Sequence, residues 1–216
     1  MTAPTGPTAA PANPVPADPY APAEAHAQIF GAAEAAAREA LGEALVDAIL
    51  HRGELTLVVD RDAIGQVLAL LRDHPELRFD RLADLTAVDY LDLGREPRFA
   101  VVYHLMSRSS LARLRVRALV PEDDPLIASA VPLFPMANYP EREVYDLFGI
   151  AFSGHPYLKR IMMPDDWDGH PLRKDYPIGA EEIEFSFNQE DVDQQRPHSN
   201  TEREERYKLN HSVNNF

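Results

Sequence analysis

The chain has 216 residues, of which 45% are hydrophobic, and it contains no cysteine. This composition allows one packed domain with extensions, and it excludes disulfides, thiolate nucleophiles and cysteine-bound iron–sulfur clusters. The formal net charge of −14 opposes binding to nucleic acid or to anionic lipid, so the expected partner is another protein.

The amino end is rich in alanine and proline and has no basic residue before Arg38. Residues 1–23 are predicted to be a disordered leader, because such a composition buries too little apolar surface to fold. Secretory signals and mitochondrial transit peptides both carry basic residues near the amino end, and no apolar run approaches the ~18 residues of a membrane span. We therefore expect a protein of the cytoplasm of a bacterium-like cell.

Two helical regions are predicted in the first half of the chain. Residues 24–50 are rich in alanine and favour one or two helices, interrupted near Gly31 or Gly42. Residues 61–73 follow a capping residue, Asp60, and place apolar side chains at helical spacing. The side chains predicted to form the buried face of this second helix are Ile64, Val67, Leu68 and Leu71.

Strand-like segments surround and follow the second helix. Each is rich in β-branched residues or alternates apolar with polar residues. Because three of them are consecutive, the sequence predicts an α+β domain over residues 24–137, with a mixed, largely antiparallel sheet and helices packed on one side. The segments are residues 54–60, 82–93, 98–107 and 111–120.

The last of these segments carries arginine at every second position, at Arg113, Arg115 and Arg117. A period of two places the three guanidinium groups on one face of the sheet and the intervening apolar side chains on the other. Carboxylates of a neighbouring strand, such as Asp89, can neutralise this row. The alternative is a cationic patch that meets an acidic partner protein.

Residues 138–177 carry the most informative pattern, which predicts a short helix followed by a proline-rich strap. The helix is expected to begin near Pro140 and to end at Gly149. Arg142 and Asp146 lie four residues apart and can pair on one helix face. After the helix, repeated prolines favour a stiff, extended segment, which is suited to docking on a partner.

Two acidic residues fall in the first turn of this helix, Glu141 and Glu143. Negative charge there complements the helix dipole. Their carboxylates are also expected to pair with Arg173 or Lys174. Acid–base catalysis by the two is disfavoured, because residues two apart on a helix diverge.

Short motifs follow one another along this region in a fixed order. They are Glu141-Arg142-Glu143, Asp146-Leu147-Phe148-Gly149, Gly154-His155-Pro156, Lys159-Arg160-Ile161, Asp166-Trp167 and Gly169-His170-Pro171-Leu172-Arg173-Lys174-Asp175-Tyr176-Pro177. Their order and spacing resemble the signature of the C subunit of the proton-pumping NADH-quinone oxidoreductase (respiratory complex I), which is the 30-kDa-type family. Tyr139 departs from that pattern, because members of the family often have Trp there.

The resemblance implies a non-redox structural subunit in the peripheral arm, which supports the quinone-reducing module and the proton translocation coupled to it. Its partners would be the D subunit, the B subunit and the subunits that carry the iron–sulfur clusters. It would lie on the cytoplasmic side of the bacterial membrane, held there only through the complex. No catalytic residue, cofactor or metal is expected. The signature residues expected to serve in docking are Glu141, Arg142, Glu143, Asp146, Gly149, His155, Pro156, Arg160, Trp167, His170, Pro171, Arg173, Lys174 and Asp175.

Two alternatives stay open. Membrane-bound hydrogenases and the photosynthetic counterpart of complex I contain an equivalent subunit, so the sequence does not name the electron donor or the quinone. The other alternative is a free-standing metal-dependent hydrolase, because donor atoms of a metal site occur at His155, Asp165, Asp166, Asp168 and His170. Their spacing differs from the helical histidine pair of familiar hydrolases, and the adjacent prolines favour ring nitrogens bonded to nearby backbone.

Residues 178–216 are predicted to form an acidic, extended tail. Ile183, Phe185 and Phe187 alternate within it, which fits an arm that adds a strand to a partner or lies across it. The alternative for this tail is simple disorder.

Overall fold

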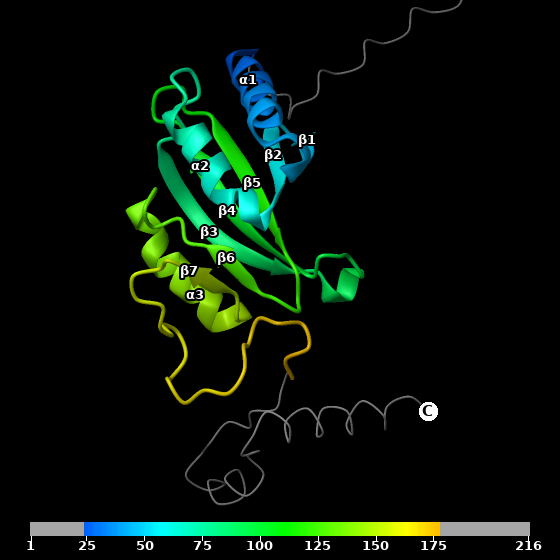
Figure 1. Cartoon of the computed structure of the whole chain (residues 1–216), viewed down its shortest axis with the longest axis vertical. Coiled ribbons are helices and arrows are strands. Elements are labelled where there is room, and N and C mark those ends of the chain that lie inside the picture. Colours follow the sequence, from blue (N-terminus) through cyan, green and yellow to red (C-terminus); the bar gives the residue numbers. More distant parts are fainter. Residues whose placement is uncertain (1–23, 178–216) are drawn as a thin grey trace, which may run out of the picture.

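A five-stranded sheet is the centre of the computed structural model, which describes residues 24–177 (Figure 1). Its strands are β1 (Leu45–His51), β2 (Glu54–Asp60), β3 (Arg81–Asp89), β4 (Phe99–Met106) and β5 (Arg113–Val120). The strand order is β1-β2-β5-β4-β3, with β2 and β5 parallel and the other neighbours antiparallel. The predicted mixed, largely antiparallel sheet is confirmed.

Three α-helices pack against one face of this sheet (Figure 1). Their buried side chains, including Phe30, Leu68 and Val144, join those of the sheet in a single core. All four apolar residues predicted for the buried face of the second helix are buried. The helices are α1 (Glu24–Leu41), α2 (Ile64–Asp73) and α3 (Asn138–Phe148).

The connections are short and partly helical. Before α2, the Asp60 carboxylate accepts a hydrogen bond of 2.9 Å from the Asp62 N–H, as expected of a cap. Two short strands, β6 (Leu126–Ala128) and β7 (Ala151–Ser153), pair in parallel on either side of α3 in the chain. The 3₁₀ turns are Gly42–Ala44, Arg61–Ala63, Leu91–Leu93 and Pro135–Ala137.

The prediction of helix up to residue 50 is wrong after Leu41. Gly42 adopts a left-handed backbone with φ of 55° and ends α1. Residues Leu45–His51 then form β1, which pairs with residues 54–59 of β2. Arg52 and Gly53 join the two strands, and both have positive φ, which is the conformation of a tight two-residue hairpin turn.

Three other boundaries differ from the sequence prediction. The third strand ends at Asp89, where a 3₁₀ turn replaces the predicted extension to residue 93. Helix α3 begins at Asn138, so Pro140 lies in the first turn, where a missing N–H costs no helical hydrogen bond. β6 lies within a segment that was expected to be only a connection.

None of the helices between residues 24 and 177 is both long and apolar enough to cross a membrane. The predictions for the leader (1–23) and for the tail (178–216) lie outside the described residues.

Candidate functional site

The candidate site consists of helix α3 and the segment that follows it, residues 149–177, which we call the strap. The carboxylate of Asp146 is fully buried at the junction of the two. It accepts hydrogen bonds from the N–H groups of Ile161, Met162 and Met163, at 2.7–2.9 Å, and from the Arg160 guanidinium at 2.6 Å. One carboxylate therefore fixes three consecutive strap residues to the helix.

The charge of Asp146 is maintained in this buried position. Burial by itself raises the pKa of a carboxyl group. The hydrogen bonds from the Met163 N–H, the Arg160 guanidinium and the two other backbone groups outweigh it and hold the pKa of Asp146 below its usual value. Asp146 is thus a structural anion at neutral pH.

Arg160 extends this anchor to the second half of the strap. Besides Asp146, its guanidinium donates to the carbonyl groups of Trp167 and Gly169, each at 3.0 Å. Arg142 of α3 donates to the carbonyl groups of Lys159 and Arg160, also at 3.0 Å. The predicted Arg142–Asp146 pair is therefore wrong, because the strap occupies both side chains.

The two histidines bond to nearby backbone, as the sequence predicted. His155 Nε2 donates to the Asn138 carbonyl at 3.0 Å, while its Nδ1 accepts from the Tyr157 N–H at 3.0 Å. His170 Nδ1 donates to the Asp146 carbonyl at 2.8 Å, and burial lowers the pKa of this ring. Within residues 24–177, no group of three or more His, Asp or Glu side chains is placed to hold a metal ion.

The end of α3 is closed by the last part of the strap. Gly149 has φ of 72°, and a Cβ there would lie 2.5 Å from the His170 ring and 2.6 Å from the Arg173 guanidinium. Arg173 Nε donates to the Phe148 carbonyl at 2.6 Å, at the helix end where positive charge is favourable. A glycine is needed here for its backbone conformation and for space.

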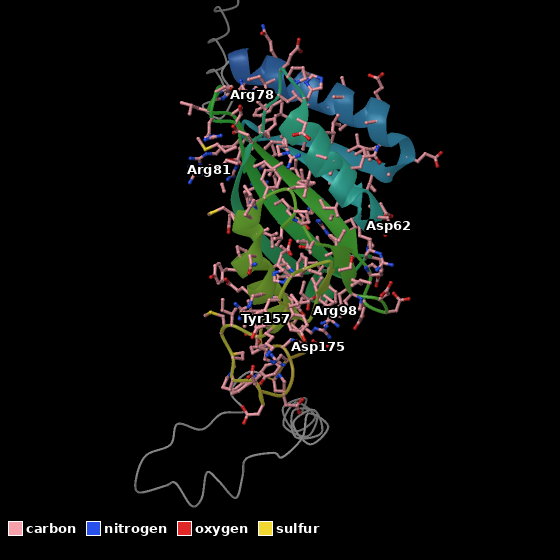
Figure 2. All side chains as sticks on the ribbon, turned by 60° about the vertical axis from the view of Figure 1, so that its left-hand side comes forward. Asp62, Arg78, Arg81, Arg98, Tyr157 and Asp175 are labelled. Carbon is pink, nitrogen blue, oxygen red and sulfur yellow. The ribbon has the colours of Figure 1, made fainter. Side chains whose placement is uncertain are left out.

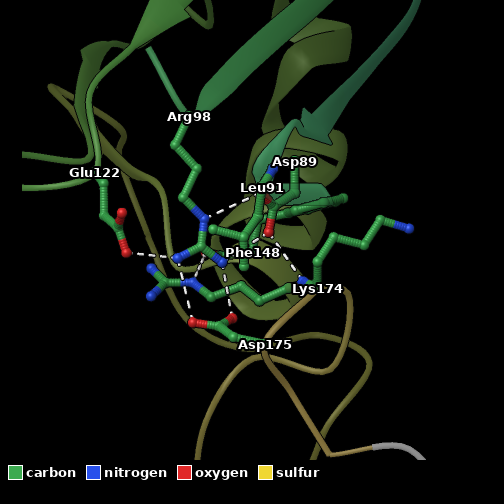
Figure 3. Close-up of polar contacts among 8 residues, drawn as sticks. Asp89, Leu91, Arg98, Glu122, Phe148, Lys174 and Asp175 are labelled. Carbon is green, nitrogen blue, oxygen red and sulfur yellow. Dashed lines mark hydrogen bonds and ion pairs between the residues drawn. The ribbon is translucent and has the colours of Figure 1, made fainter. Parts of the chain in front are cut away.

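A buried arginine ties the carboxyl end of the strap to the sheet (Figure 3). Arg98, only 2% exposed, binds the Asp89 carboxylate through two hydrogen bonds, at 2.8 and 3.0 Å. Its remaining N–H groups bind Asp175, at 2.8 and 3.2 Å, and Glu122. The Lys174 N–H also donates to Asp89, at 2.9 Å. We call Arg98, Asp89, Glu122 and Asp175 the Arg98 cluster.

Comparisons with known proteins show the family of the chain. Residues 57–182 match the family model of the respiratory-chain NADH dehydrogenase 30 Kd subunit. The chain belongs to this family. The match covers part of β2, the strands β3, β4 and β5, helices α2 and α3 and the whole strap. It bears out the resemblance of the signature motifs.

Individual relatives agree with this family. The chain is 52% identical over 160 residues to the C subunit of the NADH-quinone oxidoreductase of Roseiflexus sp. (strain RS-1), which covers 74% of this chain and 91% of the relative. It is 48% identical over 161 residues to the same subunit of Thiobacillus denitrificans (strain ATCC 25259 / T1), covering 72% and 80%.

One solved structure is also similar. It is a chain of the membrane-bound sulfane sulfur reductase, an archaeal respiratory membrane complex, with 25% identity and a TM-score of 0.55. The match covers 68% of this chain and 86% of that one.

Several signature residues of this family member point inward. Glu141 is fully buried and accepts hydrogen bonds from the Ser129 hydroxyl and the Ala130 N–H, each at 2.6 Å. The predicted pairing of Glu141 with Arg173 or Lys174 is therefore wrong. Burial, only partly offset by these two bonds, raises the pKa of Glu141 to about 7. Glu143, by contrast, is exposed.

The remaining signature residues surround these anchors. Trp167 and Pro171 are partly buried in the strap, whereas Pro156 and Lys174 are exposed. The Arg98 cluster was not predicted from the sequence, which indicated that Asp89 pairs with the arginine row of β5. Asp89 instead binds Arg98, because both lie at the same end of the sheet, where β3 ends and β4 begins.

The region of α3 and the strap exposes several large apolar and aromatic side chains. The Arg142 guanidinium carbon lies 6.0 Å from the centre of the Tyr139 ring and 5.6 Å from that of Tyr157. We call the large exposed apolar and aromatic side chains of the strap, of α3 and of the 3₁₀ turn before it the strap surface. They are Met136, Tyr139, Tyr157, Ile161, Met162 and Leu172, which are 39–66% exposed.

Proposed function

We propose that the chain is a non-redox structural subunit of the peripheral arm of NADH-quinone oxidoreductase (complex I), and that it docks on a neighbouring subunit through the strap surface. The observation that carries this proposal is that some residues of this region fix the strap to α3 while others stay exposed. Asp146, Arg160 and His170 hold the strap from within. Tyr139, Tyr157 and their neighbours are thereby left exposed in a fixed arrangement.

The composition of the strap surface supports docking. Tyrosine, methionine and arginine are enriched in protein–protein interfaces relative to other surfaces. Tyr139 and Tyr157 are 66% and 56% exposed although they are large. Because the Arg142 guanidinium lies close to both rings and the strap backbone is held by Asp146, little conformational entropy remains to be lost on binding.

The partners that we propose are the D subunit and, with it, the B subunit and those that carry the clusters, on the cytoplasmic side of the membrane. This assignment is supported by family membership and by the relatives, which are named as subunits of the same oxidoreductase. Contact with the membrane would then occur only through the complex. The 25% identity to a sulfane sulfur reductase chain, against 52% to a C subunit, favours complex I over the other respiratory complexes.

A role without chemistry of its own is supported by the site itself. Asp146, His155 and His170 are each engaged by backbone groups, so none of them is a free acid, base or ligand. The chain has no cysteine for a cluster. A hydrolase built on the two histidines would need a shared metal position, and the arrangement found between residues 24 and 177 does not favour one.

Replacing two aromatic residues tests the docking role. Tyr139→Ala with Tyr157→Ala should leave the melting temperature of the isolated protein nearly unchanged, because both side chains are more than half exposed. The amount of this subunit in the purified, detergent-solubilised complex should fall at least about tenfold, as expected for the loss of two interface anchors. Quantitative mass spectrometry of the complex measures it.

A matched control is Leu91→Ala with Leu93→Ala, which removes two exposed apolar side chains elsewhere, 42% and 67% exposed. Normal incorporation of this control is expected. If the tyrosine variant is incorporated as well as the control, the strap surface does not dock.

The non-catalytic role has its own test. In complexes that carry Asp146→Ala, NADH oxidation by an artificial acceptor should remain, while quinone reduction should fall in proportion to the lost subunit. A complex that keeps its full set of subunits and yet shows no quinone reduction would contradict a purely structural role.

A further inference from the structure

The face of the sheet opposite the helices holds a groove at its far end from the strap. Arg81, Met106 and Arg113 lie side by side across three adjacent strands, because Met106 of β4 is in register with both arginines. The groove has a volume of about 550 Å³ and is lined by these residues together with Asp84, His104, Arg115 and Glu54. In Figure 2, Arg81 is labelled in the upper half of the described structure and Tyr157 in the lower half.

The two arginines at the rim of this groove have no charged partner in the part of the chain that the structure describes. Arg81 and Arg113 are exposed, and neither forms an ion pair or side-chain hydrogen bond within residues 24–177. Their neighbour Arg115 differs, since it donates to Glu54 at 2.7 Å and to Thr56 at 3.2 Å. Arg117 donates to the Tyr90 hydroxyl. Among the described residues, Arg115 is thus the one member of the predicted arginine row that is paired with a carboxylate.

The charge of the groove contrasts with that of the chain. The groove contains three guanidinium groups and two carboxylates, and one carboxylate, Glu54, is already paired with Arg115. The whole chain carries a net charge of −14. The net negative charge would repel a nucleic acid or an anionic membrane, because each is large enough to face much of the surface. A short acidic protein segment can contact the groove without approaching the rest of the chain.

We propose that this groove binds an acidic segment of a second subunit of the complex. The inference rests on the proposed function, since it assumes that the chain is part of an assembly. Arg81 and Arg113 lie on strands that are separated by one strand, so their backbones are about 10 Å apart. A fitting segment carries two carboxylates at about that separation, each able to accept a bidentate bond, with an apolar side chain over Met106 between them.

This second contact would make the chain a bridge. The groove lies at the end of the sheet where β3 begins and β4 ends, whereas the strap is bound at the opposite end, where β3 ends at Asp89. One subunit would be held mainly by aromatic contacts at the strap, and another mainly by charge at the groove. The two contacts should therefore differ in their response to salt, because exposed ion pairs are screened and apolar contacts are not.

Cross-linking identifies the occupant of the groove. The photoreactive residue p-benzoylphenylalanine is placed at position 106 in the assembled complex, and at position 157 in a parallel sample. We expect the groove probe to join a peptide of another subunit with at least two Asp or Glu residues within one or two turns of each other. A product with lipid, with nucleic acid or with a segment lacking carboxylates overturns the proposal.

The parallel sample separates the two proposals. If the probe at position 157 cross-links a subunit while the probe at position 106 yields no product, the groove faces solvent and only the groove proposal fails. If position 157 yields no product while position 106 joins an acidic segment, the strap surface fails as the docking site and the groove stands.

Charge removal gives an independent measurement. Arg81→Gln with Arg113→Gln should leave the melting temperature of the protein unchanged within ~1 °C, since neither side chain has a partner to lose within residues 24–177. Retention of the variant in the complex after washing at about 0.3 M salt should fall about fivefold. Arg38→Gln, in an exposed pair with Glu34 on α1, is the control and should be retained like the wild type. Equal retention of all three proteins contradicts the proposal.

Discussion

Glu141 occupies the least favourable position of any carboxylate in the site. Its side chain is fully buried and has two neutral donors but no cation among the described residues. The Tyr103 hydroxyl, also buried, has no hydrogen-bond partner in the same part of the chain, and burial together with the charge of Glu141 raises its pKa. The region between α3 and the sheet therefore favours the protonated form of Glu141.

This position makes the stability of the folded chain sensitive to pH. The pKa of Glu141 is raised from 4.5 to about 7 in the folded chain. Its favourable contribution is therefore complete below pH 4.5 and is lost as the pH rises through 7. At one pKa unit per 1.36 kcal/mol, the loss from pH 4.5 to pH 8 is about 3 kcal/mol of unfolding free energy.

Glu141→Gln should remove this dependence. The amide keeps the shape and can accept the Ala130 N–H, so the variant should match the wild type near pH 5. At pH 8 its unfolding free energy should exceed that of the wild type by about 2–3 kcal/mol. Urea unfolding of both proteins from pH 5 to pH 8 measures the difference, in which the titration of all other groups cancels. Parallel curves would show that Glu141 ionises normally.

At the scale of elements, the end of α3 depends on one residue without a side chain. Gly149→Ala would place a methyl group 2.5 Å from the His170 ring, in a left-handed backbone. The backbone costs about 1–2 kcal/mol, and the strap must also move. We expect a total loss of about 2–4 kcal/mol in unfolding free energy.

A second glycine provides the control for this change. Gly65 lies in α2, and a methyl group there would meet no atom within 4 Å. Gly65→Ala should be neutral or stabilise the protein by up to about 1 kcal/mol, through helix propensity. Chemical denaturation of the two variants should thus give effects of opposite sign. Similar small effects in both would show that the strap adapts to a side chain at position 149.

The elements differ in how far the sequence could predict them. β2 and α2 were predicted because the apolar pattern of β2 fits only a strand and that of α2 fits only a helix. β1 was missed, since its apolar residues at 45, 46, 49 and 50 also match a helical face and follow a genuine helix. The signal that could have found it is Gly53, a turn residue directly before Glu54, which is paired with His51 at the start of β2.

The site shows a different limit of prediction. The backbone contacts of the two histidines could be predicted, because the prolines that favour them are adjacent in the sequence. The Arg98 cluster joins residues that are 9, 24 and 77 positions apart from Arg98. No local pattern predicts such a set, because it exists only after the sheet and the strap have been brought together. The same holds for Glu141, whose donors lie on the preceding connection.

At the scale of the whole molecule, the Arg98 cluster connects the sheet to the strap. Burial by itself raises the pKa of Asp89, but the bonds from Arg98 and from the Lys174 and Leu91 N–H groups hold it below its usual value. The stability that this carboxylate contributes is therefore present at neutral pH and is lost as the pH falls through its folded pKa. Acid should release the strap from the sheet, which is the opposite of the effect of Glu141.

Two substitutions separate the parts of this connection. Arg98→Met leaves the buried charge of Asp89 without its partner, so unfolding free energy should fall by about 3–5 kcal/mol. Asp175→Asn removes a half-exposed carboxylate, and the loss should stay below about 1 kcal/mol. In Asp175→Asn, hydrogen exchange at residues 172–176 should accelerate by up to about fivefold while α2 is unchanged, because only the strap end opens. Equal losses of stability in the two variants would mean that sheet and strap unfold as one unit.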